Sequence, residues 1–155
     1  MHPLSFLSKS RQTLFTITLF HLYSFSMTNT TDTKKTILLI EDDQNLRELY
    51  QKVLTIAGYD VSVATDGQEG LLKLQQGGFQ LVLLDMMLPK MNGIEVLKKL
   101  KAHPAKVQNQ KIVLMSNLSE DGVLKEAEEL GAASHIVKSE ITPGILLEHV
   151  KTLIS

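Results

Sequence analysis

The chain has 155 residues, a formal net charge of −1 and no cysteine. The length supports one domain with a sizeable core, and the charge gives no basic footprint for nucleic acid. The lack of cysteine excludes disulfides, thiolate catalysis and cysteine-based zinc sites. Together with alternating apolar runs and amphipathic stretches, it favours a cytoplasmic protein.

The first part of the chain, residues 1–34, is interpreted as an N-terminal extension that precedes a domain at 35–155. Two basic residues come before the apolar run 14–20, which loosely resembles a signal peptide. No clear small-residue cleavage site follows, and the run is too short and polar to predict a membrane span. Because a polar lead runs from Met27 into the first strand, we favour Met27 as the natural start over a targeting segment.

The rest of the chain alternates five times between patterns typical of strands and of helices. The predicted strands are Thr36–Glu41, Tyr59–Ala64, Phe79–Leu84, Lys111–Met115 and Ser134–Val137. The helices between and after them are predicted to begin near Asp43, Gln68, Asn92, Ser119 and Thr142. In the last helix, the residues expected to face inward are Ile145, Leu146, Val150, Leu153 and Ile154. This alternation predicts an α/β fold, a doubly wound parallel sheet with helices on both faces.

Polar residues stand at the carboxyl ends of four of the five predicted strands. Glu41 and Asp42 follow the first, Asp85 ends the apolar run of the third, Ser116 follows the fourth and Lys138 the fifth. Parallel strands present these ends on one edge, where open α/β sheets bind ligands. Converging carboxylates are unfavourable without a cation or a proton, and hard oxygen ligands suit Mg²⁺. The pattern predicts phosphoryl chemistry, with a carboxylate as nucleophile and a lysine and a hydroxyl near the phosphoryl oxygens.

This set of residues, together with Pro89 and Gly93 after Asp85, resembles the receiver domain of response regulators in two-component signalling, over about 35 to 155. The resemblance implies a flavodoxin-like (βα)5 sheet with strand order 2-1-3-4-5. It also implies a stand-alone signalling module that takes phosphate from a sensor histidine kinase or a phosphotransfer protein. Its output would be a changed affinity for a partner protein, without direct binding to nucleic acid or membrane. A monomer or weak homodimer is expected.

The resemblance also implies roles for the acidic residues. Asp85 would be phosphorylated and would contribute to the Mg²⁺ site. Asp42 would bind Mg²⁺ directly, Glu41 would help through water, and the backbone carbonyl of Met87 would be a further ligand. We interpret Asp43 as the cap of the following helix rather than as a metal ligand.

Three further positions concern the switch that follows phosphorylation. By resemblance, Ser116 would bond to the phosphoryl group, Lys138 would pair with it, and His135 would stand where the family usually has an aromatic residue. His135 is either a pH-sensitive switch or a half-buried ring in the role of a tyrosine, and we favour the second. The family favours proline after the lysine, but this chain has Ser139, which leaves the isomer of that peptide bond open. Asn117 replaces a small residue and would narrow access to the phosphate.

Two other functions use a similar sheet. An Mg²⁺-dependent phosphohydrolase with an aspartyl nucleophile would carry Asp-x-Asp after the first strand, whereas here Met87 stands two residues after Asp85 on the third. A flavodoxin-like electron carrier would have a phosphate loop rich in Thr, Ser and Gly after the first strand. The acids in that loop of this chain, Glu41, Asp42 and Asp43, would repel FMN, so the receiver interpretation is favoured.

Overall fold

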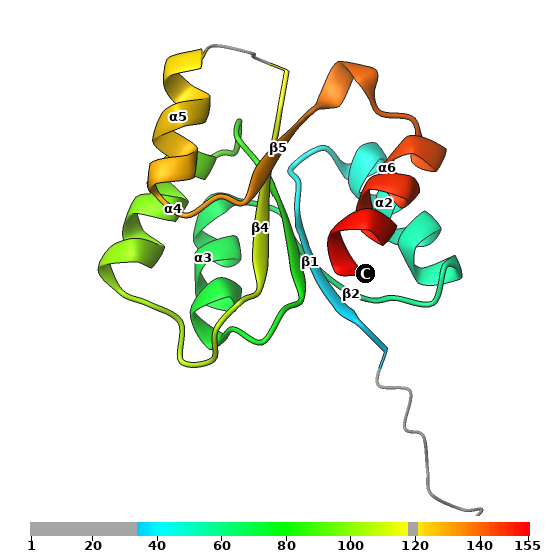
Figure 1. Cartoon of the computed structure of the whole chain (residues 1–155), viewed down its shortest axis with the longest axis horizontal. Coiled ribbons are helices and arrows are strands. Elements are labelled where there is room, and N and C mark those ends of the chain that lie inside the picture. Colours follow the sequence, from blue (N-terminus) through cyan, green and yellow to red (C-terminus); the bar gives the residue numbers. More distant parts are fainter. Residues whose placement is uncertain (1–33, 118–120) are drawn as a thin grey trace, which may run out of the picture. The chain divides into compact units, whose positions relative to one another are not determined.

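The computed structural model describes residues 34–117 and 121–155. Strands and helices alternate along this part of the chain as the sequence predicts (Figure 1). The strands are β1 Thr36–Ile40, β2 Asp60–Ala64, β3 Leu81–Asp85, β4 Lys111–Ser116 and β5 Ser134–Val137. The helices are α2 Gln44–Ile56, α3 Gly67–Gln76, α4 Gly93–Ala102, α5 Asp121–Glu129 and α6 Pro143–Ile154, with a 3₁₀ turn, η1, at Lys138–Glu140.

The five strands form one parallel sheet in the order β2-β1-β3-β4-β5. Helices α3, α4 and α5 cover one face, and α2 and α6 cover the other (Figure 1). The predicted doubly wound (βα)5 fold and its strand order are therefore confirmed. In this arrangement the carboxyl ends of β1 and β3 are neighbours, which brings the acidic residues of two separate chain segments to one place.

The central strands are buried on both faces, which explains their continuous apolar runs. All five residues of β3 are buried, and alternate residues belong to two hydrophobic cores, one on each side of the sheet. Leu83 packs with the core under α2 and α6, whereas Leu84 packs with the core under α3 and α4. Burial of each of these side chains stabilises the folded state by about 2 kcal/mol. The rigid centre of the sheet therefore supports the residue at its end, Asp85.

Strand ends differ from the prediction by one or two residues. The third strand begins at Leu81 and includes Asp85, and the fourth extends to Ser116. The inward placement of Ile145 was wrong, because this residue is 43% exposed while Leu146 and Val150 are fully buried. Successive helical residues lie about 100° apart, so the helix face that buries Leu146 turns Ile145 toward solvent.

Two expectations lie outside the described residues. They are the status of the N-terminal extension, with Met27 as its proposed start, and the helix cap at Ser119. In the part of the chain that the structure describes, no helix has both the length and the apolar character needed to cross a membrane.

Candidate functional site

Asp85 ends the central strand β3 and is only 3% exposed. Its Oδ1 accepts a hydrogen bond from the backbone amide of Met87 at 3.0 Å. The start of α4 packs directly against this point, since the amide of Gly93 donates to the carbonyl of Met86 at 2.9 Å. A Cβ atom at Gly93 would lie 2.7 Å from the carbonyl oxygen of Asp85, so glycine is required for this close approach. The strand end and the helix start thus hold Asp85 in one position.

Three carboxylates meet at this edge of the sheet. Glu41, Asp42 and Asp85 each offer an oxygen, and these oxygens lie within 4.8 Å of one another. Lys138 comes from the end of β5, and its Nζ is 2.7 Å from Asp85 Oδ2 and 2.7 Å from Glu41 Oε2. Ionised, three carboxylates against one ammonium leave a formal charge of −2. The cluster of acids that the sequence predicts is therefore present, with the predicted lysine inside it.

Burial and charge act on the protonation of this cluster. Burial raises the pKa of Glu41, the adjacent ammonium of Lys138 opposes this effect, and the nearby negative charge of Asp85 adds to it. Burial alone would lower the pKa of Lys138, but the bonds to Asp85 and Glu41 outweigh it and the net shift is upward. Lys138 therefore remains charged at neutral pH, whereas keeping Glu41 ionised in the folded protein costs free energy.

The residues present fit a small divalent cation. Glu41 Oε2 is buried and forms an ion pair of 2.7 Å with Lys138, but it accepts no aligned hydrogen bond. A buried carboxylate oxygen with an ion pair but no aligned hydrogen bond keeps a lone pair that a metal cation can use. The donors are hard oxygens and the charge is −2, which together suit Mg²⁺. Asp42 is exposed, so the site is open to solvent on its side.

Met87 joins this site through its backbone. The residue is 66% exposed, and its amide contacts Asp85, as described above. The predicted role of its carbonyl as a metal ligand stays a prediction.

Sequence reasoning missed Arg47, which organises the loop between β1 and α2. Its Nη1 donates to the backbone carbonyl of Glu41 at 2.9 Å and to that of Asp42 at 3.0 Å. A positive charge in the first turn of a helix interacts unfavourably with the helix dipole. The position of Arg47 therefore could have indicated a role other than helix stabilisation. Arg47 fixes the backbone that carries two of the three carboxylates.

The remaining predicted residues lie on the two strands beyond β3. Ser116 ends β4 and is 1% exposed, in register with Val137 of β5. His135 is exposed, so the expectation of a half-buried ring was wrong. The physical reason is that β5 is the edge strand: Ile136 faces the core, and the preceding residue faces away from it. The peptide bond from Lys138 to Ser139 is trans.

The two neighbouring acids after β1 differ in their surroundings, which allows a direct test. Asp43 accepts a hydrogen bond from the amide of Leu46 at 2.9 Å and caps α2, as predicted. We expect Asp42→Ala to weaken Mg²⁺ binding more than tenfold, and Asp43→Ala to cost about 1 kcal/mol of stability with Mg²⁺ binding largely retained. Calorimetric titration with Mg²⁺ and urea unfolding measure the two effects. An equal loss of affinity in both variants would show that the pair is misassigned.

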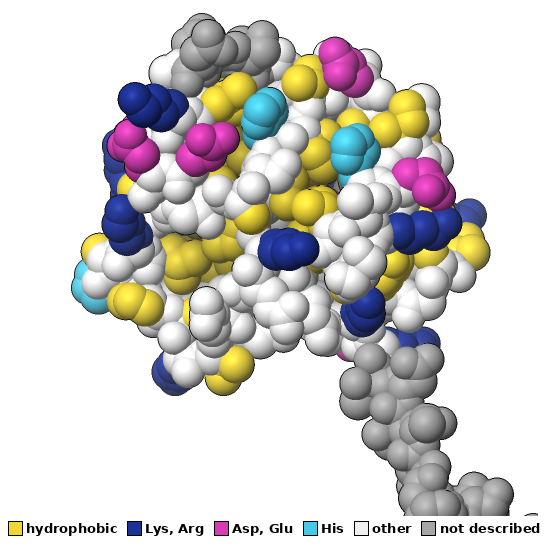
Figure 2. Space-filling view, viewed as in Figure 1, with side chains coloured by type: hydrophobic (Ala, Val, Ile, Leu, Met, Phe, Trp, Pro, Cys, Tyr) yellow, Lys and Arg dark blue, Asp and Glu magenta, His cyan; other side chains and the backbone are white. Residues whose placement is uncertain are grey.

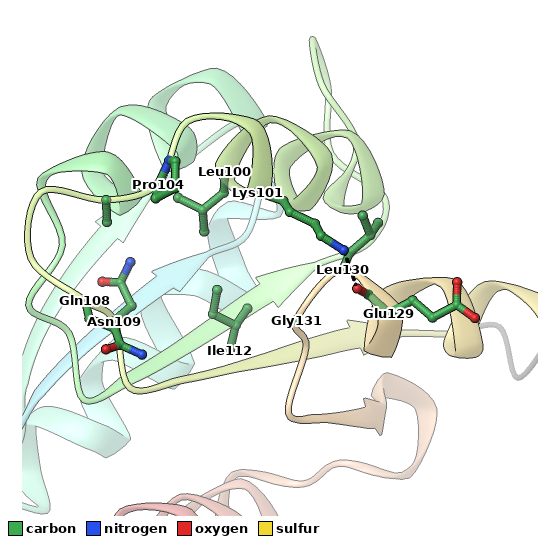
Figure 3. Close-up of a pocket in the computed structure, with 10 residues that line it drawn as sticks. Leu100, Lys101, Pro104, Gln108, Asn109, Ile112, Glu129, Leu130 and Gly131 are labelled. Carbon is green, nitrogen blue, oxygen red and sulfur yellow. Dashed lines mark hydrogen bonds between the residues drawn. The ribbon is translucent and has the colours of Figure 1, made fainter.

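A cavity of about 510 Å³ lies away from this cluster. Figure 3 shows it between the end of α4, the loop that follows and the end of α5, with Leu100, Asn109 and Leu130 among its lining residues. Lys101 donates to the carbonyl of Glu129 across one side of it at 2.8 Å. Ile112, at the amino end of β4, lies at its floor, whereas Asp85 lies at the carboxyl end of the sheet. The cavity is therefore separate from the site.

Comparisons with known proteins agree with this geometry. Residues 37–151 match the family model of the response regulator receiver domain. A transcriptional regulatory protein CpxR homolog of Haemophilus influenzae is 42% identical over 96 residues, which are 62% of this chain and 40% of that protein. The sporulation initiation phosphotransferase F of Bacillus subtilis is 34% identical over 102 residues, 66% of this chain and 80% of that protein.

Similarity in structure agrees with similarity in sequence. The crystal structure of a CheY-like response regulator receiver domain protein from Methanospirillum hungatei JF-1 has a TM-score of 0.69 at 30% identity, and the match covers 78% of this chain and 94% of that one. Several curated relatives are much longer than the matched region, and the chain spans 40% and 39% of the length of two of them. With an acidic cluster at the expected sheet edge and a family match over most of its length, the chain belongs to the response regulator receiver domain family.

Proposed function

We propose that the chain is a phospho-accepting response regulator that takes a phosphoryl group from a phosphohistidine onto Asp85 in an Mg²⁺-dependent reaction. The observation that carries this proposal is the buried Asp85 carboxylate, held between the ammonium of Lys138 and the amide of Met87 and beside two further acids. The name of the Bacillus subtilis relative, a phosphotransferase, supports it. The donor would be a sensor histidine kinase or a phosphotransfer protein in the cytoplasm.

The arrangement prepares Asp85 to act as a nucleophile. A carboxylate oxygen of Asp85 attacks phosphorus, the P–O bond forms as the P–N bond to the donor imidazole breaks, and the bonding electrons stay on nitrogen. Ionised Asp85 has no proton to lose, so no general base is needed. Lys138 is 2.7 Å from Oδ2 and can balance the charge of a phosphoryl oxygen there. Bound Mg²⁺, held by Glu41, Asp42, Asp85 and the carbonyl of Met87, would supply further neutralisation of the phosphoryl oxygens.

Acetyl phosphate provides a direct test, since it can donate without a kinase. With Mg²⁺ present, we expect one phosphoryl group per chain by mass spectrometry. The modification should be lost in Asp85→Asn and on removal of Mg²⁺ with EDTA. An equal level of modification in Asp85→Asn would assign the phosphate to another residue and refute the proposal.

The switch is proposed to run from Ser116 to the surface that α5, β5 and α6 form. A phosphoryl group on Asp85 adds charge and acceptor oxygens, which the hydroxyl of Ser116 can bond. The exposed ring of His135 could then turn inward and change that surface. Figure 2 shows histidine and hydrophobic side chains on this face. A groove of about 480 Å³ lies between β5 and α6 and is lined by Ile136, Ile145 and His149, among others, which suits binding to a partner protein.

The Ser116 hydroxyl can be tested separately from phosphorylation. We expect Ser116→Ala to accept phosphate on Asp85 but to show less than about half of the wild-type response at the β5–α6 surface, because a modification shifts a conformational equilibrium only through contacts that differ between the states. Amide chemical shifts at Ile136 and Gly144, recorded with and without beryllofluoride, measure the response. A full response in Ser116→Ala would exclude a path from this hydroxyl to His135.

A further inference from the structure

The loop that follows Asp85 is tied to a distant part of the chain by an ion pair. Lys90 Nζ lies 2.5 Å from Oδ2 of Asp66, 24 residues earlier in the sequence. Asp66 is only 8% exposed, and its other oxygen, Oδ1, accepts from the amide of Glu69 at 2.8 Å and caps α3. The hydrogen bond from Lys90 is the main reason that the pKa of Asp66 lies below its ordinary value. The Asp66 carboxylate therefore caps α3 through one oxygen and binds the loop after β3 through the other.

The backbone at Lys90 is unusual. Its φ is +65°, and it is the only non-glycine residue with a positive φ in the described part of the chain. A lysine is strained in this left-handed region, and such a residue persists only where its surroundings hold it. The ion pair with Asp66 supplies a contact of this kind.

A second contact joins the same two segments. The amide of Gly67 lies 3.4 Å from the carbonyl of Pro89, and a Cβ atom at Gly67 would lie 1.8 Å from the carbonyl oxygen of Met91. The start of α3 and the loop therefore approach each other so closely that only glycine fits between them. The loop is anchored on both sides of Lys90.

The anchored loop is the one that shapes the Asp85 site. Met87 lies three residues before Lys90, and its amide donates to Asp85 Oδ1. At the far end of the loop, the amide of Gly93 returns to the carbonyl of Met86. Lys90 is therefore linked by a short stretch of backbone to the amide that orients the acceptor carboxylate. Site residues on loops keep their geometry only when supporting contacts hold them.

We propose that Lys90 and Asp66 form a positioning pair that holds the loop 86–92 so that the amide of Met87 stays bonded to Asp85. Neither residue touches the reacting atoms. The consequence for phosphorylation rests on the proposed function, whereas the consequence for the Met87 amide does not. Loss of the pair loosens the loop, weakens the Met87–Asp85 hydrogen bond and slows phosphorylation of Asp85.

Two substitutions remove the ion pair, one from each side. Asp66→Asn keeps an oxygen that can cap α3, because asparagine caps as well as aspartate, but removes the charge that faces Lys90. Lys90→Gly removes the other partner and also relieves the left-handed strain, so an equal effect in both variants assigns that effect to the ion pair rather than to the strain. Lys98→Ala is the matched control, since it removes an exposed ion pair with Glu126 of 2.7 Å between α4 and α5.

Hydrogen exchange of the Met87 amide, followed by NMR in the full unphosphorylated chain, is the first measurement. We expect exchange to be about fivefold faster in Asp66→Asn and in Lys90→Gly and unchanged in Lys98→Ala. The second measurement is the rate of phosphorylation by acetyl phosphate, expected to fall about fivefold in the same two variants. The double variant should be no slower than either single one, because both remove one interaction.

Unchanged Met87 exchange in both variants would overturn the proposal, and so would slower phosphorylation with Met87 protection intact. Lower stability in urea without faster Met87 exchange would show that the pair has only a structural role, and would also overturn the proposal. A wild-type chain that takes no phosphate on Asp85 would refute the proposed function instead. In that case Met87 exchange still decides whether the pair positions the loop.

Discussion

Lys138→Met is expected to lower the free energy of unfolding by about 3 kcal/mol at neutral pH without Mg²⁺. Lys138 is the cation that balances two carboxylates, Asp85 and Glu41, whose side chains are 4% and 1% exposed. Its loss leaves both charges buried beside each other, which costs more than an ordinary ion pair contributes. Methionine keeps the length and most of the apolar volume of the lysine chain, so the change isolates the charge.

Urea unfolding in EDTA and in Mg²⁺ measures this effect. Lys151→Met is the matched control, because Lys151 also forms an ion pair, 2.9 Å from Glu148, but both partners are largely exposed. It should cost less than about 1 kcal/mol. Added Mg²⁺ should narrow the stability difference between Lys138→Met and the wild type, and should leave the difference between the control and the wild type unchanged. If the two variants lose equal stability in EDTA, the buried cluster does not depend on the charge of Lys138.

The fold follows from local patterns that are complete within short segments. The run Leu81–Leu84 is apolar at every position because both faces of β3 are buried, and this is visible without tertiary information. Asp85 can be recognised as a candidate site residue from the same run, because a carboxylate at the end of a buried apolar strand is unfavourable unless it has a function. The rule that parallel strands end on one edge of the sheet was needed to group the other site residues, Glu41, Asp42, Ser116 and Lys138.

Other features could not be predicted, because they depend on contacts between distant segments. Nothing near Lys90 in the sequence points to Asp66, and the left-handed backbone at Lys90 is not encoded by a glycine. Arg47 acts on the carbonyls of Glu41 and Asp42, which carry no sequence signal. His135 was misjudged because its exposure depends on the edge position of β5 and on which face of the strand it occupies.

Glu41→Gln is expected to stabilise the Mg²⁺-free protein by about 1 kcal/mol at neutral pH while weakening Mg²⁺ binding. Glu41 is 1% exposed, and its Oε2 lacks a well-aligned hydrogen bond. Burial raises its pKa above the ordinary value of 4.5. Glutamine keeps the shape without the charge, and Lys138 keeps its contact of 2.7 Å with Asp85.

The pH dependence has a definite sign. Because the pKa of Glu41 is higher in the folded than in the unfolded chain, its stabilising contribution is fully present below the unfolded pKa, near 4.5. It is lost as the pH rises through the raised folded pKa. The glutamine side chain of the variant cannot titrate, so the stability advantage of Glu41→Gln should be smallest in acid and should grow toward neutral pH.

Urea unfolding at several pH values in EDTA, repeated with Mg²⁺, tests this prediction. Glu148→Gln is the control, because Glu148 is an exposed partner of Lys151 and should show no such pH-dependent advantage. With Mg²⁺, the order should reverse, since a cation that binds only the folded state stabilises the wild type more than the variant with weaker binding. An advantage that shrinks with rising pH would contradict the raised pKa of Glu41, and an advantage that persists unchanged in Mg²⁺ would contradict a metal-binding role for the buried carboxylate. A reversal in Mg²⁺ would mean that Glu41 destabilises the free protein and stabilises the cation-bound protein, as expected of a residue kept for function rather than for the fold.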